Sequence, residues 1–114
     1  MSVHCEIRNG IGLVSISSSL NAAVADSFPQ QVGDWLQTAP DVKLVVLDLG
    51  EVNFMDSSGL GAMISIFKRL AGRGGKVVVA RPQSAVKLML QITRADQIIR
   101  VYDTVEDAMR AGES

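Results

Sequence analysis

The chain has one cysteine and one histidine among its 114 residues, which excludes several kinds of site. Cys5 has no second thiol for an internal disulfide, so a reducing cytoplasm fits best. His4 has no thiol or imidazole set with which to hold zinc. It would serve a serine hydrolase triad only beside one of the chain's loop serines, and a histidine in a predicted hairpin strand is usually a surface residue. The sequence therefore indicates no catalytic histidine, metal or cofactor.

Excess positive charge and long apolar runs are also missing. The net charge is −1, so no broad basic field is available to hold a phosphate backbone, and nucleic acid is not an expected partner. No apolar run approaches the ~18–20 residues that span a bilayer, and no secretory leader pattern opens the chain. We expect a cytoplasmic protein without direct membrane contact, and the length suits one domain over residues 1–114.

Short apolar strands alternate with helical periodicity along the rest of the chain. Residues 3–8 and 11–17 are β-prone, and Asn9-Gly10 between them is a strong hairpin signal because a type I′ turn needs positive φ at both positions. Further strands are predicted at 42–49, 76–80 and 98–102, with helices between them. Right-handed crossovers then imply parallel pairing, so the fold class is α/β with a mixed, partly parallel sheet and a central strand at 42–49.

The helix after the central strand is expected to begin at residue 57 or 58. One face is apolar and should pack on the sheet: Leu60, Met63, Ile64, Phe67, Leu70 and Ala71. The opposite side is made of small residues with few charges: Ser58, Ala62, Ser65 and Arg69, with Gly59 and Ile66 at its edge. A partner could approach this strip closely, although an ordinary solvated face would have the same spacing.

Two other helices carry conflicting or weaker signals. Apolar residues repeat at helical spacing from Val24 to Ala39, yet Pro29 lies among them and Ser27 reads as a cap for a helix that starts there. The helix either begins near 27 or begins near 22 and bends, so an irregular turn is expected at 25–29. After Pro82 a further apolar stripe is predicted to be buried, and a short helix over 104–111 ends the chain; the stripe is Ala85, Leu88, Met89 and Ile92.

Acidic residues follow the central strand and offer one enzymatic interpretation. Asp48, Glu51 and Asp56 could together hold a magnesium ion in a small phosphoryl-transfer or nucleotide-hydrolysing enzyme. A solvated acidic loop is the simpler interpretation. The glycines at 59–61 and 72–75 lack the spacing and the strand-to-helix position of a phosphate-binding loop.

The stretch "VNFMDSSGLGAM" at 52–63 joins a predicted strand to a predicted helix and contains two adjacent serines. Such hydroxyls can cap a helix by accepting bonds from its first amides. Alternatively, one hydroxyl is a site of covalent modification. A phosphate there would meet the free amides and the positive dipole end of the helix, while adding about −1.5 to −2 charges to the neighbouring surface.

The segment "LVVLDLGEVNFMDSSGLGAMISIFKRL" resembles the signature of the STAS domain, and in particular the small anti-sigma factor antagonists of bacterial partner-switching systems. The resemblance implies one STAS domain with about five strands and about four helices, mainly on one side. It further implies that Ser57, directly after Asp56, is phosphorylated by an anti-sigma factor that is also a serine kinase of the histidine-kinase-like ATPase type. The unphosphorylated form would bind that partner, and a PP2C-type phosphatase would restore it.

The resemblance and the small-residue strip together define an expected partner-binding surface: Asn21, Asp56, Ser58, Gly59, Ala62, Ser65, Ile66 and Arg69. Two positions depart from the family pattern, because Ser18 or Ser19 replaces a glycine and Asn21 replaces an aspartate. The second change removes a charge from the expected docking surface. A constitutive STAS scaffold, as a subunit of a transporter or a signalling assembly, is the other binding hypothesis.

Overall fold

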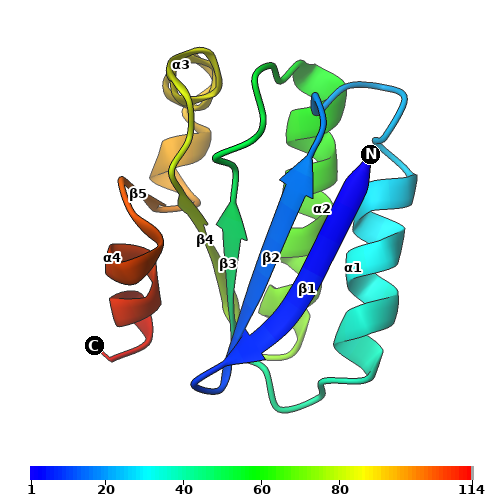
Figure 1. Ribbon diagram of the computed structural model, residues 1–114, viewed down its shortest axis with the longest axis vertical. Coiled ribbons are helices and arrows are strands. Elements are labelled where there is room, and N and C mark those ends of the chain that lie inside the picture. Colours follow the sequence, from blue (N-terminus) through cyan, green and yellow to red (C-terminus); the bar gives the residue numbers. More distant parts are fainter. Residues whose placement is uncertain (114) are drawn as a thin grey trace.

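The predicted hairpin opens the chain in the computed structural model, which describes residues 1–113 (Figure 1). Strand β1 (Ser2–Arg8) pairs antiparallel with β2 (Ile11–Ser17). Asn9 and Gly10 between them have φ values of +53° and +79°, as a type I′ turn requires. The hairpin prediction is therefore confirmed, and it fixes a register that places Cys5 opposite Val14.

The remaining strands add to β2 in parallel, giving the sheet order β1-β2-β3-β4-β5. Strand β3 (Leu44–Asp48) is central as predicted, followed by β4 (Lys76–Ala80) and β5 (Val101–Tyr102). Strand β5 is shorter than the predicted 98–102. A 3₁₀ turn, η1 (Ala95–Gln97), precedes it, and the amides of Ile98 and Ile99 bond back to the carbonyl of Ala95, so they are not available to the sheet.

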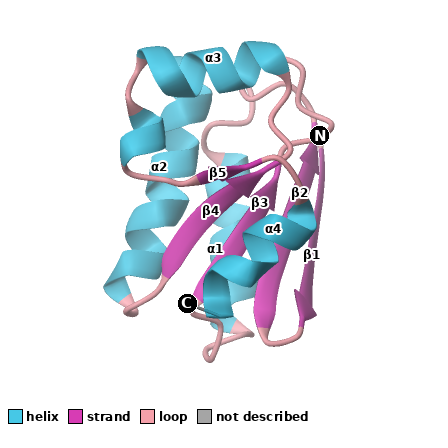
Figure 2. Ribbon diagram, turned by 90° about the vertical axis from the view of Figure 1, so that its left-hand side faces the viewer, coloured by secondary structure: helices cyan, strands magenta, loops and turns pink. Residues whose placement is uncertain are grey.

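The sheet separates two clusters of buried apolar residues, a larger one and a smaller one. Three helices contribute to the larger cluster, and a fourth packs against the smaller cluster on the opposite face of the sheet. Helices α1 (Ser27–Gln37) and α2 (Ser57–Gly72) lie side by side on one face, and α3 (Ser84–Ile92) adds to the same cluster (Figure 1). Helix α4 (Val105–Met109) packs on the opposite face, continuing into a 3₁₀ turn, η2 (Arg110–Glu113) (Figure 2). This arrangement confirms the predicted mixed α/β fold with helices mainly on one side.

Helix α1 begins at Ser27 after turns at residues 22–26, so the predicted irregularity before Pro29 is confirmed. Pro29 falls in the first turn, where a backbone N–H would have no intrahelical acceptor. The predicted capping role of Ser27 is wrong. Asp26 occupies the cap position, and no side-chain hydrogen bond caps this helix end.

The buried face of α2 is rotated from the predicted one. It consists of Gly59, Ala62, Met63, Ile66 and Leu70, while Leu60, Ile64 and Phe67 are only half-buried and Ala71 is exposed. Helix α2 contacts α1 as well as β4, so Gly59, Ala62 and Ile66 are buried although they belong to the side that carries small residues. A prediction from amphipathic spacing alone takes account of one neighbouring element, and it therefore placed the centre of the core face too far from α1.

The predicted core stripe of α3 is also wrong. Val86 and Leu90 are buried and Met89 is half-buried, whereas Ala85, Leu88 and Ile92 are exposed. Apolar residues occur on more than one side of this helix, so periodicity could not determine which side faces the core.

Arg73, just after α2, holds the end of α1 in place. Its guanidinium donates hydrogen bonds to the carbonyls of Leu36 (3.0 Å), Ala39 (2.9 Å) and Val42 (3.4 Å). These carbonyls lie at and beyond the end of α1, where a helix leaves acceptors without intrahelical donors. One side chain thus joins the ends of the two helices that carry the candidate site.

We expect Arg73→Ala to lower the free energy of unfolding by about 2 kcal/mol, because partly buried carbonyls lose a charged donor. Urea denaturation followed by circular dichroism measures this. Lys68→Ala is the matched control, since the Lys68 side chain is exposed and makes no hydrogen bond or ion pair with residues 1–113. Equal stability of the two variants would show that the Arg73 contacts contribute nothing.

Candidate functional site

The loop from β3 to α2 is fixed to the segment that follows β2. The amide of Leu20 donates to the carbonyl of Phe54 (2.8 Å), and the amide of Asp56 donates to the carbonyl of Leu20 (3.1 Å). Leu20 and Met55 form an isolated parallel bridge, and the Leu20 side chain is fully buried. Two segments more than 30 residues apart in the sequence therefore meet at the start of α2.

Asp56 caps α2, and the two serines do not. Its carboxylate accepts a hydrogen bond from the amide of Gly59 (3.0 Å). Ser57 is the first helical residue and is exposed, while Ser58 is half-buried. Neither hydroxyl makes a hydrogen bond with any other residue in the described chain. Capping therefore does not explain why two serines stand here, and the Ser57 hydroxyl is open to solvent.

Gly59 is required by the fold, which corrects its assignment to the accessible strip. A Cβ at this position would lie 2.0 Å from the carbonyl oxygen of Leu20, a distance that no real structure tolerates. Ile66 is corrected for a different reason: it is 1% exposed and belongs to the larger core cluster. Gly59 packs against the Leu20 backbone and Ile66 packs in the core, so neither faces solvent.

A groove of about 590 Å³ runs between α1 and α2. From α2 it is lined by Ser58, Ala62, Ser65 and Arg69, which brings these four predicted surface residues together, and by Gly61. Ala62 is only 4% exposed and forms part of the floor. The α1 side contributes Ala25, Asp26, Pro29, Gln30, Asp34 and Gln37.

Charged side chains of both signs line this groove. The guanidinium of Arg69 lies across α1 at Gly33, where an added Cβ would come within 2.7 Å of its Cζ atom. Arg69 makes no ion pair with residues 1–113, and Asp26 and Asp34 on the opposite side are exposed and equally unpaired. The groove therefore offers an incoming protein one cation and two carboxylates.

Asn21 lies next to the α2 start because its neighbour Leu20 is bonded to the loop. Its Oδ1 accepts a hydrogen bond from the amide of Ala23 (3.0 Å), which closes a local turn, and the side chain is half-buried. Asn21 therefore shapes the segment between β2 and α1 as well as bordering the expected docking surface.

Several exposed residues at this site escaped the sequence analysis. Phe54, three residues before Ser57, is 49% exposed, which is unusual for a large apolar side chain. No periodicity marks it, because it lies in an irregular loop. The α1 side of the groove could have been found, since Asp26, Gln30, Asp34 and Gln37 recur at helical spacing and α1 is adjacent to α2 in the chain.

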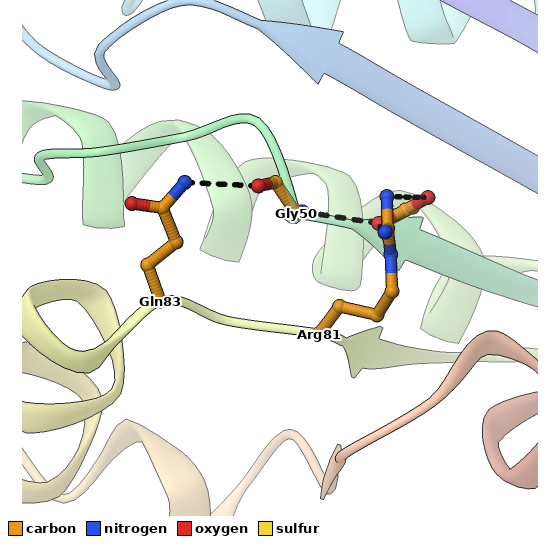
Figure 3. A network of polar contacts seen from close by, with 4 residues as sticks. Gly50, Arg81 and Gln83 are labelled. Carbon is orange, nitrogen blue, oxygen red and sulfur yellow. Dashed lines mark hydrogen bonds and ion pairs between the residues drawn. The ribbon is translucent and has the colours of Figure 1, made fainter.

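Two of the three carboxylates in the enzymatic hypothesis, Asp48 and Asp56, have separate structural roles. Asp48 accepts two hydrogen bonds from the Arg81 guanidinium (2.8 and 3.0 Å) and one from the amide of Gly50, whose carbonyl accepts from Gln83 (Figure 3). The hydrogen bond and charge of Asp48 raise the pKa of Arg81. Asp56 is the helix cap, and within residues 1–113 no group of acidic, histidine or cysteine side chains is arranged to hold a metal.

A family model described as the STAS domain matches residues 2–108. The chain belongs to the STAS domain family. The match includes both segments that meet at the start of α2, and it confirms the family identified from the motif around Ser57.

The curated relatives of this STAS protein include anti-sigma factor antagonists. It is 27% identical over 109 residues to an anti-sigma F factor antagonist of Paenibacillus polymyxa, with 96% of this chain and 92% of that protein covered. A protein of Thermotoga maritima, provisionally named an anti-sigma factor antagonist, is 34% identical over 65 residues. That match covers 57% of this chain and 58% of the Thermotoga protein.

Solved structures show the same fold. A crystal structure from T. maritima, again of a protein provisionally named an anti-sigma factor antagonist, has a TM-score of 0.88 at 26% identity and covers 98% of this chain and 95% of that one. An anti-sigma factor antagonist from Mycobacterium paratuberculosis has a TM-score of 0.86 at 24% identity, covering 99% and 94%. Among the described residues of the present chain, none of the helices has the length and apolar character needed to span a bilayer.

The two glycines at the start of α2 should respond oppositely to alanine. Gly59→Ala should lower the free energy of unfolding by several kcal/mol, because its methyl group collides with the Leu20 carbonyl. Gly61→Ala should raise it by about 0.5–1 kcal/mol, because a Cβ there meets nothing within 4 Å and glycine is costly inside a helix. Urea unfolding of the pair tests both expectations, and a stable Gly59→Ala variant would contradict the close approach.

Proposed function

We propose that this STAS protein is an anti-sigma factor antagonist whose binding is controlled by phosphorylation of Ser57. The observation that carries the proposal is the exposed, unbonded Ser57 hydroxyl at the N-terminus of a helix already capped by Asp56. The relatives named as anti-sigma factor antagonists supply the class of partner. Nothing in the fold needs this hydroxyl, so it is free for chemistry with another protein.

A phosphate on Ser57 is compatible with the folded chain. It would lie near the first amides of α2, which have no intrahelical acceptors, and at the positive end of the helix dipole. It would also add about −1.5 to −2 charges beside Asp56 at neutral pH. A partner packed against the neutral serine would then face an unpaired, partly buried charge, and a penalty of about 3 kcal/mol weakens binding about a hundredfold.

The proposed partners follow the family pattern. A cytoplasmic anti-sigma factor of the histidine-kinase-like ATPase type binds the unphosphorylated protein and transfers phosphate to Ser57, and a PP2C-type phosphatase reverses the step. SpoIIAA, an anti-sigma factor antagonist whose structures are described as unphosphorylated and phosphorylated, shares the fold at 16% and 15% identity and TM-scores of 0.80 and 0.71. The shared fold of these two forms supports the proposal that the folded domain tolerates a phosphate.

We assign the docking surface to the α2 start and the adjoining groove. Phe54 supplies an exposed aromatic anchor next to the switch serine, and such residues often carry much of the energy of an interface. Asn21 and Asp56 border the serine, and Ser58, Ser65 and Arg69 extend the surface along α2 over the Ala62 floor. Asp26 and Asp34 add a negative side along α1.

Incubation with the cognate kinase and ATP should add one phosphate, on Ser57. Ser57→Ala should stay permanently competent to bind the anti-sigma factor. Ser57→Asp should bind at least tenfold more weakly while remaining folded, because a carboxylate at a helix N-terminus is locally favourable. Phosphosite mass spectrometry and isothermal titration calorimetry measure these outcomes, with Trp35 fluorescence as the check on folding.

Ser58→Ala is the matched control for position. It removes only the neighbouring, half-buried hydroxyl and adds no charge, so the single phosphate should still appear on Ser57. A phosphate found on Ser58 would make the assignment within the motif wrong. If Ser57→Asp binds as tightly as the wild type, the switch hypothesis fails and the constitutive scaffold takes its place.

The groove is tested by filling it. Ser65→Tyr places a ring in the groove and should weaken anti-sigma factor binding at least tenfold without loss of stability, since Ser65 is exposed. Gln31→Tyr is the control, because Gln31 is exposed on α1 outside the groove. Equal affinities for the two variants would place the interface elsewhere.

A further inference from the structure

Helix α3 carries an apolar row that faces solvent in addition to the one that faces the core. Val86 and Leu90 are buried, whereas Leu88 is 54% exposed and Ile92 is 70% exposed. Together with exposed Ala85 they follow the i, i+3, i+7 spacing that forms a seam between two paired helices. Ile98, just beyond η1, is 59% exposed. Large apolar residues in such a row are typical of a surface that another protein element covers.

The two ends of this helix carry opposite charge. At its N-terminal end Gln83 donates to the Gly50 carbonyl, which brings exposed Glu51 alongside, while the charge of Arg81 is matched by its bidentate pair with Asp48 (Figure 3). At the C-terminal end stands Arg94, which is exposed. An antiparallel neighbour with the same charges would bring each arginine toward the other's glutamate.

Arg94 has a backbone conformation that arginine rarely adopts. Its φ is +61°, in the left-handed region that favours glycine at helix ends. Arg81 shares this feature at +56°, but its guanidinium is used in the Asp48 pair. The Arg94 side chain makes no hydrogen bond or ion pair within residues 1–113. The Arg94 guanidinium is therefore available for a contact with another molecule.

We propose that α3 pairs antiparallel with α3 of a second copy of this chain, about a twofold axis near Leu88. In this arrangement Leu88 packs on Leu88 of the second copy, and Ile92 packs on Ala85, so a large side chain opposes a small one at each end. Arg94 reaches Glu51 of the other copy. The interface is isologous, as in most homodimers. It covers the exposed apolar row and gives Arg94 an acidic partner.

The pairing is weak because the helix is short. A nine-residue helix covers far less than the ~800 Å² per partner of a standard interface, so we expect a transient dimer. It does not involve Ser57 or the groove between α1 and α2, and it holds whether or not the proposed function is correct.

Sedimentation equilibrium of the full chain between about 1 μM and 1 mM tests the proposal and should show a reversible monomer–dimer equilibrium. Leu88→Asp should weaken dimerisation at least tenfold, because it places a charge at the centre of the seam. Ile7→Asp is the matched control. Ile7 is 54% exposed on edge strand β1, so its replacement removes similar exposed apolar surface and should leave the dimer unchanged.

Exchanging the charges of Arg94 and Glu51 tests the antiparallel geometry of the dimer. Arg94→Glu and Glu51→Arg should each weaken the dimer severalfold, and the double variant should restore it, since the ion pair is re-formed with reversed signs. A parallel pairing or a heterologous contact would not give this rescue.

Three results would overturn the proposal. In the first, the chain stays monomeric up to 1 mM. In the second, Ile7→Asp dissociates the dimer, which would assign the dimer interface to the edge of the sheet. In the third, the wild type is monomeric and Leu88→Asp weakens anti-sigma factor binding, which would assign this face of α3 to the anti-sigma factor. Near-ultraviolet circular dichroism of each variant checks that the fold is retained.

Discussion

The backbone hydrogen bonds between Leu20 and the Phe54–Asp56 loop are the constraint on which the candidate site depends. They hold the segment after β2 against the start of α2, and they do so at a separation that only glycine at position 59 allows. The surroundings of Ser57 follow from this contact, because Asn21 comes from one of the two segments and Asp56 from the other. The groove lies beside them, between α1 and α2. The site is therefore a property of the fold and not of one loop.

The division of roles among Asp56, Ser57 and Gly59 resolves the ambiguity of the motif. A residue that caps a helix, a residue that we propose to be modified and a residue that permits close packing all occur within four positions. Aspartate takes the cap, which leaves the serine hydroxyl unbonded, and glycine takes the packing contact. Had Ser57 been the cap, its modification would have broken the helix end that presents it.

Much of the fold was predictable from local signals, whereas the faces of its helices were not. Asn9-Gly10 determines the hairpin, and the β-branched runs at 42–49 and 76–80 determine the central strands, because each signal is contained in a few adjacent residues. The burial of Ile66 and the exposure of Leu88 depend on which neighbours each helix acquires, and spacing along one helix does not contain that information. Asp56 and Ser57 were recognisable because the motif is local, and the polar spacing of α1 indicated the other side of the groove, but the exposure of Phe54 depends on the packing of distant segments.

The bonds from Leu20 to Phe54 and Asp56 would also determine how an enzyme recognises the proposed modification site at Ser57. Many modification sites lie in mobile loops and are read as short extended peptides. Here the serine begins a helix whose first turn is held by buried backbone bonds to a segment more than 30 residues away, so the extended form is accessible only when the domain unfolds. An enzyme that acts on Ser57 must bind the assembled surface, and a synthetic peptide spanning residues 50–65 lacks the features that make it a substrate.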